Sequence, residues 1–334
     1  MKHRILPLFI PHLGGPNQCV FCNQKRISGS LFPVSGADVQ RALSGLGEEK
    51  NYELAFYGGS FTAIPMEEQH RLLEAVQPFR ETGTITAIRV STRPDAIDEE
   101  RLTLLKAMGV TTIELGAQSM NEEVLLLSRR GHGAGDVVKA SRLIKAWGFS
   151  LVLQMMTGLP GETMESSIES AKRIIALEPD AVRLYPTVII RDTPLYESWL
   201  RGEYREHRVE DAVEVCAELL PLFQAAHIPV IRLGLNPTDE LSGGEAVGGA
   251  YHPALGELVQ SRLCRRECET LLTGAEPGSS VTVFVPERML SRYIGQKKAN
   301  VAYLTERFSL KSLTFRPCSG EKVLVEIAKS SAMV

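Results

Sequence analysis

The chain has 334 residues, 44% of them hydrophobic and 23% charged, which is ordinary for a globular protein with one large and one small domain. Its net charge of −3 excludes a general attraction to nucleic acid, so any such contact needs a local basic surface. Six cysteines at this length do not indicate a disulfide scaffold, and no stretch approaches the ~18 apolar residues of a membrane span. We expect a cytoplasmic protein with no signal peptide and no membrane contact.

Short β-branched segments alternate with amphipathic ones over most of the chain. The expected strands are Ile5–Ile10, Glu53–Tyr57, Thr86–Ser91, Thr111–Gly116, Ser150–Met155, Ala181–Tyr185 and Pro229–Leu233. Asp98 is the expected N-cap of the helix that follows it, and Gly109 its expected C-cap. Nearly continuous apolar strands between helices predict an α/β fold with a parallel sheet buried on both faces. The periodicity fits both an open doubly wound sheet and a partial barrel.

The loop after the first expected strand carries Cys19 and Cys22, two thiols at the spacing that grips one metal ion or iron–sulfur centre. Glycines, Pro16 and Asn23 surround them, as is typical of a loop wrapped closely around a ligand. Taken alone, the pair is also compatible with a structural role, a redox dithiol or half of a zinc site.

Glycines and polar residues follow the next expected strands, where the βα loops of such folds build their sites. Gly58, Gly59 and Ser60 form a turn whose backbone carbonyls can receive an ammonium group, and a plain tight turn is the alternative. Ser91 follows in the next strand. Arg93, just beyond it, suits a carboxylate, or else pairs with its neighbouring aspartate at a surface turn.

Further along, Gln118 is a candidate for contact with a ribose or a substrate edge. Arg129 and Arg130 suit an anionic ligand, a solvated helix end being the alternative. Arg183 and Tyr185 lie two residues apart in an expected strand, so their side chains share a face and are expected to point into a cavity together.

The segment from about Glu276 has a different pattern, a β-α-α-β order between Val281–Val285 and Ser312–Phe315. It resembles a KH-type RNA-binding module, whose GxxG loop clamps the nucleic-acid backbone. Here the loop is Gly295–Lys298, with lysine in place of the second glycine. The β-α-α-β part sets seven positive charges against Glu287 and Glu306, and these are Arg288, Arg292, Lys297, Lys298, Arg307, Lys311 and Arg316. We expect phosphate contacts here, with a solvated helix face as the alternative.

Eight motifs then occur together: FIPHLGGPNQCVFCNQ, FYGGSFT, STRPD, GAQS, RRGH, GLPGET, RLYPTVIIRDTPL and GGAYHPALGELV. In this order they resemble the radical S-adenosylmethionine (SAM) enzymes similar to the catalytic subunit of Elongator. The resemblance implies a partial (β/α)6-type radical SAM barrel in 1–236, a connector and barrel extension in 237–275, and a small KH-like α+β domain in 276–334. The acetyltransferase domain of Elongator-type enzymes has no counterpart in the sequence, so carboxymethylation by the full Elongator route is not expected.

The resemblance also implies a set of cofactor sites. It places a 4Fe–4S cluster on Cys19 and Cys22. It assigns SAM binding to Gly58, Gly59, Ser60, Ser91, Arg93, Gln118 and Arg130, and catalysis to Arg183 and Tyr185. The implied chemistry is reductive cleavage of SAM to a 5′-deoxyadenosyl radical that acts on RNA or a nucleotide, with an electron donor such as flavodoxin or ferredoxin. The alternative is a non-catalytic RNA-binding protein on a degenerate barrel.

One position departs from the family pattern. The family's loop has three cysteines spaced CxxxCxxC, and the first of them falls on Gly15. Three interpretations follow. A substitute ligand comes from His12, Asn17, Cys264 or Cys268; the cluster is labile, incomplete or three-iron; or the chain is an inactivated variant of a three-cysteine enzyme. The third is the simplest, because the loss of one codon inside an intact motif accounts for it.

Overall fold

The computed structural model describes residues 4–10, 19–22, 34–47, 50–235 and 241–328. These residues form two compact units. The barrel unit runs to Ala212 and continues from Glu218 to Pro253, and the C-terminal unit contains Val213–Ala217 and the chain from Ala254 onward. The expected connector 237–275 is therefore divided between the two units at Pro253.

A seven-stranded parallel sheet forms the centre of the barrel unit, in the order β1-β2-β3-β4-β5-β6-β8. The strands are β1 (Arg4–Phe9), β2 (Tyr52–Tyr57), β3 (Ile85–Thr92), β4 (Thr112–Gln118), β5 (Ser150–Thr157), β6 (Ala181–Pro186) and β8 (Val230–Leu233). All seven expected strands are confirmed. Spatial order follows chain order without the reversal of a doubly wound sheet, so the topology is that of a partial barrel.

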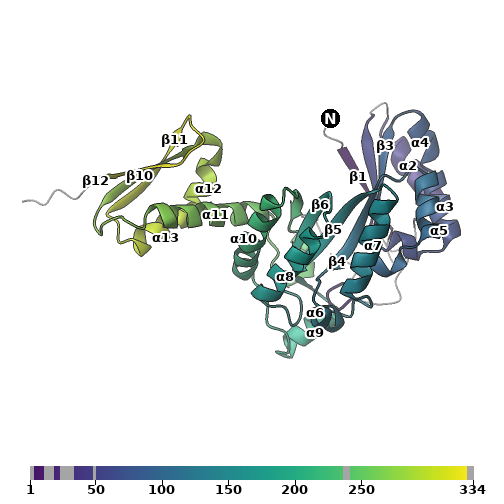
Figure 1. Ribbon diagram of the computed structural model, residues 1–334, viewed down its shortest axis with the longest axis horizontal. Coiled ribbons are helices and arrows are strands. Elements are labelled where there is room, and N and C mark those ends of the chain that lie inside the picture. The colour runs from purple at the N-terminus through teal and green to yellow at the C-terminus, as the bar shows by residue number, and fades with distance from the viewer. Residues whose placement is uncertain (1–3, 11–18, 23–33, 48–49, 236–240, 329–334) are drawn as a thin grey trace, which may run out of the picture. The chain divides into compact units, whose positions relative to one another are not determined.

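Helices follow the strands in the chain, and several of them, such as α3, α5 and α7, lie along the outside of the sheet (Figure 1). They are α2 (Gly36–Ser44), α3 (Met66–Glu74), α4 (Gln77–Glu81), α5 (Glu99–Ala107), α6 (Glu122–Leu127), α7 (Ala134–Ala146), α8 (Met164–Ile175), α9 (Pro194–Leu200) and α10 (Val209–Ala225). Asp98 caps α5 as predicted, since its side chain accepts a hydrogen bond from the backbone N–H of Arg101. The C-cap is Met108, one residue before the expected Gly109, and Gly109 follows it with a left-handed φ of 77°.

The two faces of the sheet differ in chemistry. Toward the helices the strands bury apolar side chains such as Leu54, Phe56 and Val90, all fully buried. On the other face the strands bury charges, among them Glu53 and Arg89. The expectation of apolar strands therefore holds for the outer face, while the inner face is a polar wall that lines the barrel.

A short antiparallel ribbon joins β7 (Val188–Ile190) to β9 (Ala246–Gly249) beside the sheet. Gly249 has a φ of 82°, and a Cβ atom there would lie 2.7 Å from the carbonyl oxygen of Thr187. Only glycine fits this crossing of two backbones. The ribbon follows directly after β6 and so extends the barrel at the carboxyl ends of its strands.

From Ala254 onward the C-terminal unit consists of α11 (Leu255–Leu271) and then the predicted β-α-α-β order. The order is β10 (Ser280–Pro286), α12 (Leu290–Ile294), α13 (Ala299–Arg307) and β11 (Ser312–Cys318), followed by an additional strand, β12 (Leu324–Ala328). The central strand, β10, pairs in parallel with β11 and antiparallel with β12. Cys264 and Cys268 lie in the apolar core of this unit. No helix among the described residues is long and apolar enough to cross a membrane.

Candidate functional site

The turn that carries Cys19 and Cys22 is attached by its backbone to two loops of the barrel. The N–H of Val20 donates to the carbonyl of Ser128 at 3.2 Å, and the N–H of Leu195 donates to the carbonyl of Val20 at 2.8 Å. Ser128 is the C-cap of α6, which follows β4, and Leu195 lies in the first turn of α9, which follows β6 and β7. The two thiols are therefore fixed beside the carboxyl ends of the barrel strands, where sites of parallel folds lie.

Arg130 connects this turn to the sheet. It donates to Sγ of Cys19 at 2.9 Å and to the carbonyl oxygen of Gly116 in β4 at 2.7 Å. Arg93 in turn donates to the carbonyl oxygen of Arg130 at 3.2 Å. The structure thus brings together a predicted cluster ligand and two predicted SAM-binding residues. Burial, with a smaller contribution from Cys19, raises the pKa of Cys22 to about 12.

These residues do not supply a complete set of ligands for an iron–sulfur cluster. The described part of the chain contains no group of three or more His, Cys, Asp or Glu side chains placed to hold a metal. Gly15, His12 and Asn17 lie outside the described residues. Cys264 and Cys268 are buried core residues, and burial raises their pKa values to about 11 and about 12. Two thiols are present where the family pattern has three.

The predicted glycine turn closes against the first strand. Gly58 has a φ of 95°, and a Cβ atom there would lie 3.3 Å from the Phe9 ring. The backbone N–H of Ile10 donates to the carbonyl of Tyr57 at 2.8 Å. Gly59 and Ser60 follow as half-buried residues that lead into a short 3-10 helix, Phe61–Ala63. The turn is thus a tight one that places the predicted SAM-binding glycines against the end of β1.

The other predicted SAM-binding residues occupy neighbouring strand ends. Ser91 is half-buried and lies opposite Glu114 in the β3–β4 register. Arg93 forms an ion pair with Asp95, as in the alternative interpretation, but its side chain is buried and not at the surface. Gln118 is buried with a left-handed φ of 65°, and its side-chain oxygen accepts a hydrogen bond from Gln154 at 3.2 Å.

The side chains of Arg183 and Tyr185 lie on the same face of β6, as predicted. They belong to a larger network of hydrogen bonds and ion pairs on the inner face of the sheet. Nη1 of Arg183 donates to the hydroxyl of Tyr185 at 2.9 Å, and Nη2 donates to the hydroxyl of Tyr57 in β2 at 2.6 Å. Nε of Arg183 lies 3.1 Å from Oε2 of Glu114. Desolvation by burial raises the pKa of Glu114, and the two nearest arginines oppose that shift.

The network continues to the base of the sheet through Arg89. This residue donates to both carboxylate oxygens of Glu53, at 2.9 and 3.3 Å, and its Nη1 lies 3.5 Å from Glu114. Our sequence reasoning missed Glu53, Tyr57, Arg89 and Glu114. A signal was available, because carboxylates inside the apolar strand segments YELAFY and TIELG are rarely buried without a partner.

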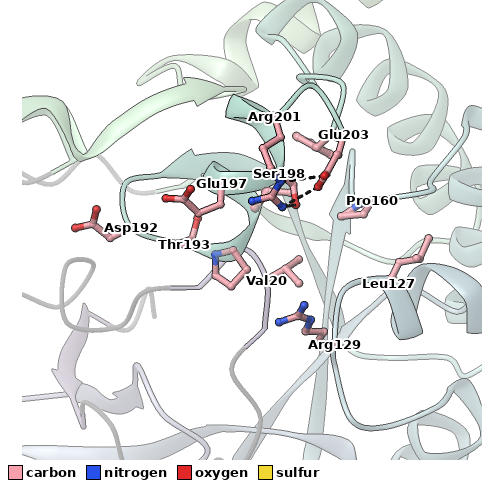
Figure 2. Close-up of a pocket in the computed structure, with 13 residues that line it drawn as sticks. Val20, Leu127, Arg129, Pro160, Asp192, Thr193, Glu197, Ser198, Arg201 and Glu203 are labelled. Carbon is pink, nitrogen blue, oxygen red and sulfur yellow. Dashed lines mark hydrogen bonds and ion pairs between the residues drawn. The ribbon is translucent and has the colours of Figure 1, made fainter.

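A pocket of about 770 Å³ lies against the cysteine-bearing turn. Figure 2 shows Val20 in its wall between Leu127 and Arg129 on one side and residues of α9 on the other. Arg201 and Glu203, two residues apart in the chain, form an ion pair in the wall at 2.7 Å. The pocket has a mixed wall of apolar and charged side chains, to which the cysteine-bearing turn contributes Val20.

His132 gives the site a pH-dependent stability. Burial, with a contribution from the Arg130 guanidinium, lowers the pKa of His132 to about 4, and Nε of Arg130 donates to its Nε2 at 3.2 Å. The folded chain therefore holds this ring neutral, while the unfolded chain protonates it below pH ~6.5. We expect the free energy of unfolding to fall by about 3 kcal/mol between pH 6.5 and pH 4 on account of His132.

The measurement is urea unfolding at several pH values for the wild type and His132→Gln. The difference between the two curves isolates the histidine. Burial also raises the pKa of Glu162 to about 7, and this carboxyl acts in the opposite direction because its stabilisation is lost as pH rises toward 7. Glu162 is present in both proteins, so its effect cancels. A pH-independent difference would contradict the prediction.

The sequence of the chain matches two protein-family models. The radical SAM superfamily model matches residues 9–174, and the radical SAM C-terminal domain model matches residues 179–265. The chain therefore belongs to the radical SAM superfamily of enzymes, whose members use a 4Fe–4S cluster and SAM. This confirms the family and the barrel predicted from the motifs.

Within the superfamily the chain is related to Elongator-type proteins. It is 35% identical over 183 residues to a tRNA uridine(34) acetyltransferase of Methanocaldococcus infernus, covering 49% of this chain and 34% of that protein. It is 33% identical over 190 residues to Elongator complex protein 3 of Homo sapiens, covering 51% and 35%. An archaeal Elp3 structure from Methanocaldococcus infernus matches 83% of this chain and 67% of that chain with 25% identity and a TM-score of 0.62. The chain spans about a third of the length of these curated relatives.

Proposed function

We propose that this chain is an Elongator-like radical SAM protein whose barrel binds SAM and a uridine-bearing RNA. We further propose that its cluster chemistry is impaired by Gly15. In the family the cluster supplies the electron that cleaves SAM reductively to a 5′-deoxyadenosyl radical. The observation that carries the proposal is the hydrogen bond from Arg130 to Cys19 Sγ at 2.9 Å, made while Arg130 also binds the end of β4. Through these two contacts Arg130 connects the thiol pair to the carboxyl end of β4, where the proposed SAM-binding residues lie.

Two features support RNA as the substrate. The relatives include a tRNA uridine(34) acetyltransferase by name. In the C-terminal unit, Lys297 and Lys298 are exposed on the loop that corresponds to the GxxG segment of KH modules. We propose that this unit holds the RNA backbone, while the barrel acts on a base.

Gly15→Cys is the direct test of the proposed function. We expect anaerobic reconstitution with iron and sulfide to load the variant with about four irons per chain, because it restores the three-thiolate pattern. The wild type should retain substantially less iron and sulfide. Only the variant should then form 5′-deoxyadenosine from SAM when a chemical reductant is supplied.

Gly14→Cys is the matched control, because it adds a thiol to the same loop at the wrong spacing. It should behave as the wild type does. Equal, full loading of the wild type would mean that Gly15 is no defect and that another ligand serves. Absence of iron–sulfur absorbance in both the wild type and Gly15→Cys would eliminate the radical SAM proposal for this chain.

The second candidate function is an RNA-binding protein without catalysis on a degenerate barrel. Glycine at the first cysteine position favours it, since two thiols do not complete the cluster pattern. It predicts RNA binding that weakens with salt in both the wild type and Gly15→Cys, with no 5′-deoxyadenosine from either protein. Formation of 5′-deoxyadenosine by Gly15→Cys alone separates the two candidates in favour of the first.

A further inference from the structure

The barrel unit carries two tyrosine hydroxyls bound to one guanidinium. Arg183 donates to the hydroxyl oxygens of both Tyr57 and Tyr185, at 2.6 and 2.9 Å. A phenol whose oxygen accepts a hydrogen bond still has its own O–H to donate. Among the residues that the structure describes, neither O–H has an acceptor. The pair therefore presents two unused donors.

The positions of both donors are fixed before any ligand binds. The Arg183 guanidinium lies over the Tyr57 ring, 5.2 Å from its centroid, and its Nε lies 3.1 Å from Glu114. Glu114 is itself 2% exposed and paired with Arg89, and the Arg183 side chain is buried, so these contacts hold the guanidinium in place. Burial raises the pKa of Tyr57 to about 12 and also raises that of Tyr185, which keeps both hydroxyls protonated at neutral pH.

The apolar surroundings of the two phenols include Phe21 of the cysteine-bearing turn and Phe9 of β1. Tyr185 packs against the buried cluster of Val124, Met156 and Leu159, and so does Phe21, which stands between the two cysteines. The Tyr57 ring lies 6.3 Å from the ring of Phe9, at the end of β1. Both tyrosines are only half-buried, so a ligand in the barrel can reach them.

The charge balance selects the type of acceptor. Glu114 and Glu53 pair with Arg183 and Arg89, so the guanidinium groups that contact the phenols or their carboxylate partner are neutralised. Arg232, in register beside Arg183, donates to the backbone carbonyls of Gly234 and Leu235. The two hydroxyls therefore offer hydrogen bonds and no ion pair of their own, which suits a ligand with two neutral acceptor oxygens. Among the four RNA bases only uracil has two ring carbonyls and no exocyclic amino group. Cytosine would place an amino donor against a phenol O–H.

We propose that Tyr57 and Tyr185, held by Arg183, receive the two carbonyl oxygens of a uracil ring, which makes Tyr57 a specificity-determining residue of the barrel. The inference rests on the proposed function, in which the barrel acts on a uridine of RNA. It adds how this chain distinguishes that base from cytosine.

The test is to measure the equilibrium binding of uridine and of cytidine to the full chain by saturation-transfer NMR. Tyr57→Phe and Tyr185→Phe each remove one hydroxyl and keep the ring, so the packing of Tyr57 with Phe9 and of Tyr185 with the Met156 cluster is preserved. We expect the wild type to prefer uridine, and each variant to bind uridine about tenfold more weakly. The preference over cytidine should fall toward one in at least one variant. Tyr196→Phe, in α9, is the matched control and should change neither value.

Three results would overturn the inference: no detectable uridine binding to the wild type, equal binding of the two nucleosides, or an unchanged preference in both barrel variants. Circular dichroism of each variant identifies a protein that has failed to fold, and Tyr57→Phe and Tyr185→Phe serve as independent tests of one another. Nucleoside binding needs no cluster, whereas the proposed function is judged by iron content and 5′-deoxyadenosine. Failure of this inference can therefore be distinguished from failure of the proposed function.

Discussion

Replacing Glu114 with glutamine should lower the free energy of unfolding of the barrel unit by about 3–5 kcal/mol. The Glu114 carboxylate is buried between two arginines, with Oε2 3.1 Å from Nε of Arg183 and 3.5 Å from Nη1 of Arg89. Glutamine keeps the size of the side chain but removes its charge. Arg89 retains Glu53, while Arg183 is left buried without a counterion, which is the costly way to break a buried pair.

Urea unfolding followed by tryptophan fluorescence measures this, because both tryptophans, Trp147 and Trp199, belong to the barrel unit. Glu67→Gln is the matched control. It removes the same charge from α3, where the Glu67 side chain is 86% exposed and lies 3.4 Å from Arg71, so the cost should be below ~1 kcal/mol. Similar losses for Glu114→Gln and Glu67→Gln would show that the inner network does not stabilise the barrel.

The strands of the barrel could be predicted from sequence, whereas the network inside it could not. Each strand is a short apolar segment next to turn residues, and these are local properties. The partners of the network are far apart in the chain: Arg89 and Glu53 are separated by 36 residues, and Arg183 and Tyr57 by 126. Only the register of the parallel sheet decides which charges meet. The sequence therefore marks Glu53 and Glu114 as unusual without naming their partners.

In the candidate site, too, the local features could be predicted from the sequence and the contacts between distant residues could not. Motif order identified the loop with Cys19 and Cys22 and the turn at Gly58, because both depend on residue types at fixed spacing. The bond from Arg130 to Cys19 joins residues 111 positions apart and became visible only in three dimensions. In the C-terminal unit, β12 escaped prediction because its residues are half-buried or exposed, with no apolar alternation strong enough to distinguish a strand from a loop.

The loop Gly295–Lys298 should carry a measurable part of the RNA affinity. Lys297 and Lys298 are exposed and have left-handed φ values of 52° and 62°. Such a conformation is unfavourable for lysine and places two adjacent ammonium groups at one turn. Changing both to alanine should reduce the slope of log affinity against log salt by about 2, one for each lost phosphate contact. Fluorescence anisotropy with a mixed-sequence single-stranded RNA at several salt concentrations measures it.

Lys298→Gly separates binding from backbone strain. Glycine removes one charge, so the salt slope should fall by about 1, but it also adopts the left-handed conformation without cost. The free energy of unfolding of the C-terminal unit should then rise by up to ~1 kcal/mol while RNA affinity falls. Lys139→Ala with Lys172→Ala, two exposed helix positions of the barrel unit, lowers the net charge equally and should leave the slope unchanged. If the slope is the same in the loop variant and in this control, the lysines of the loop do not contact phosphate.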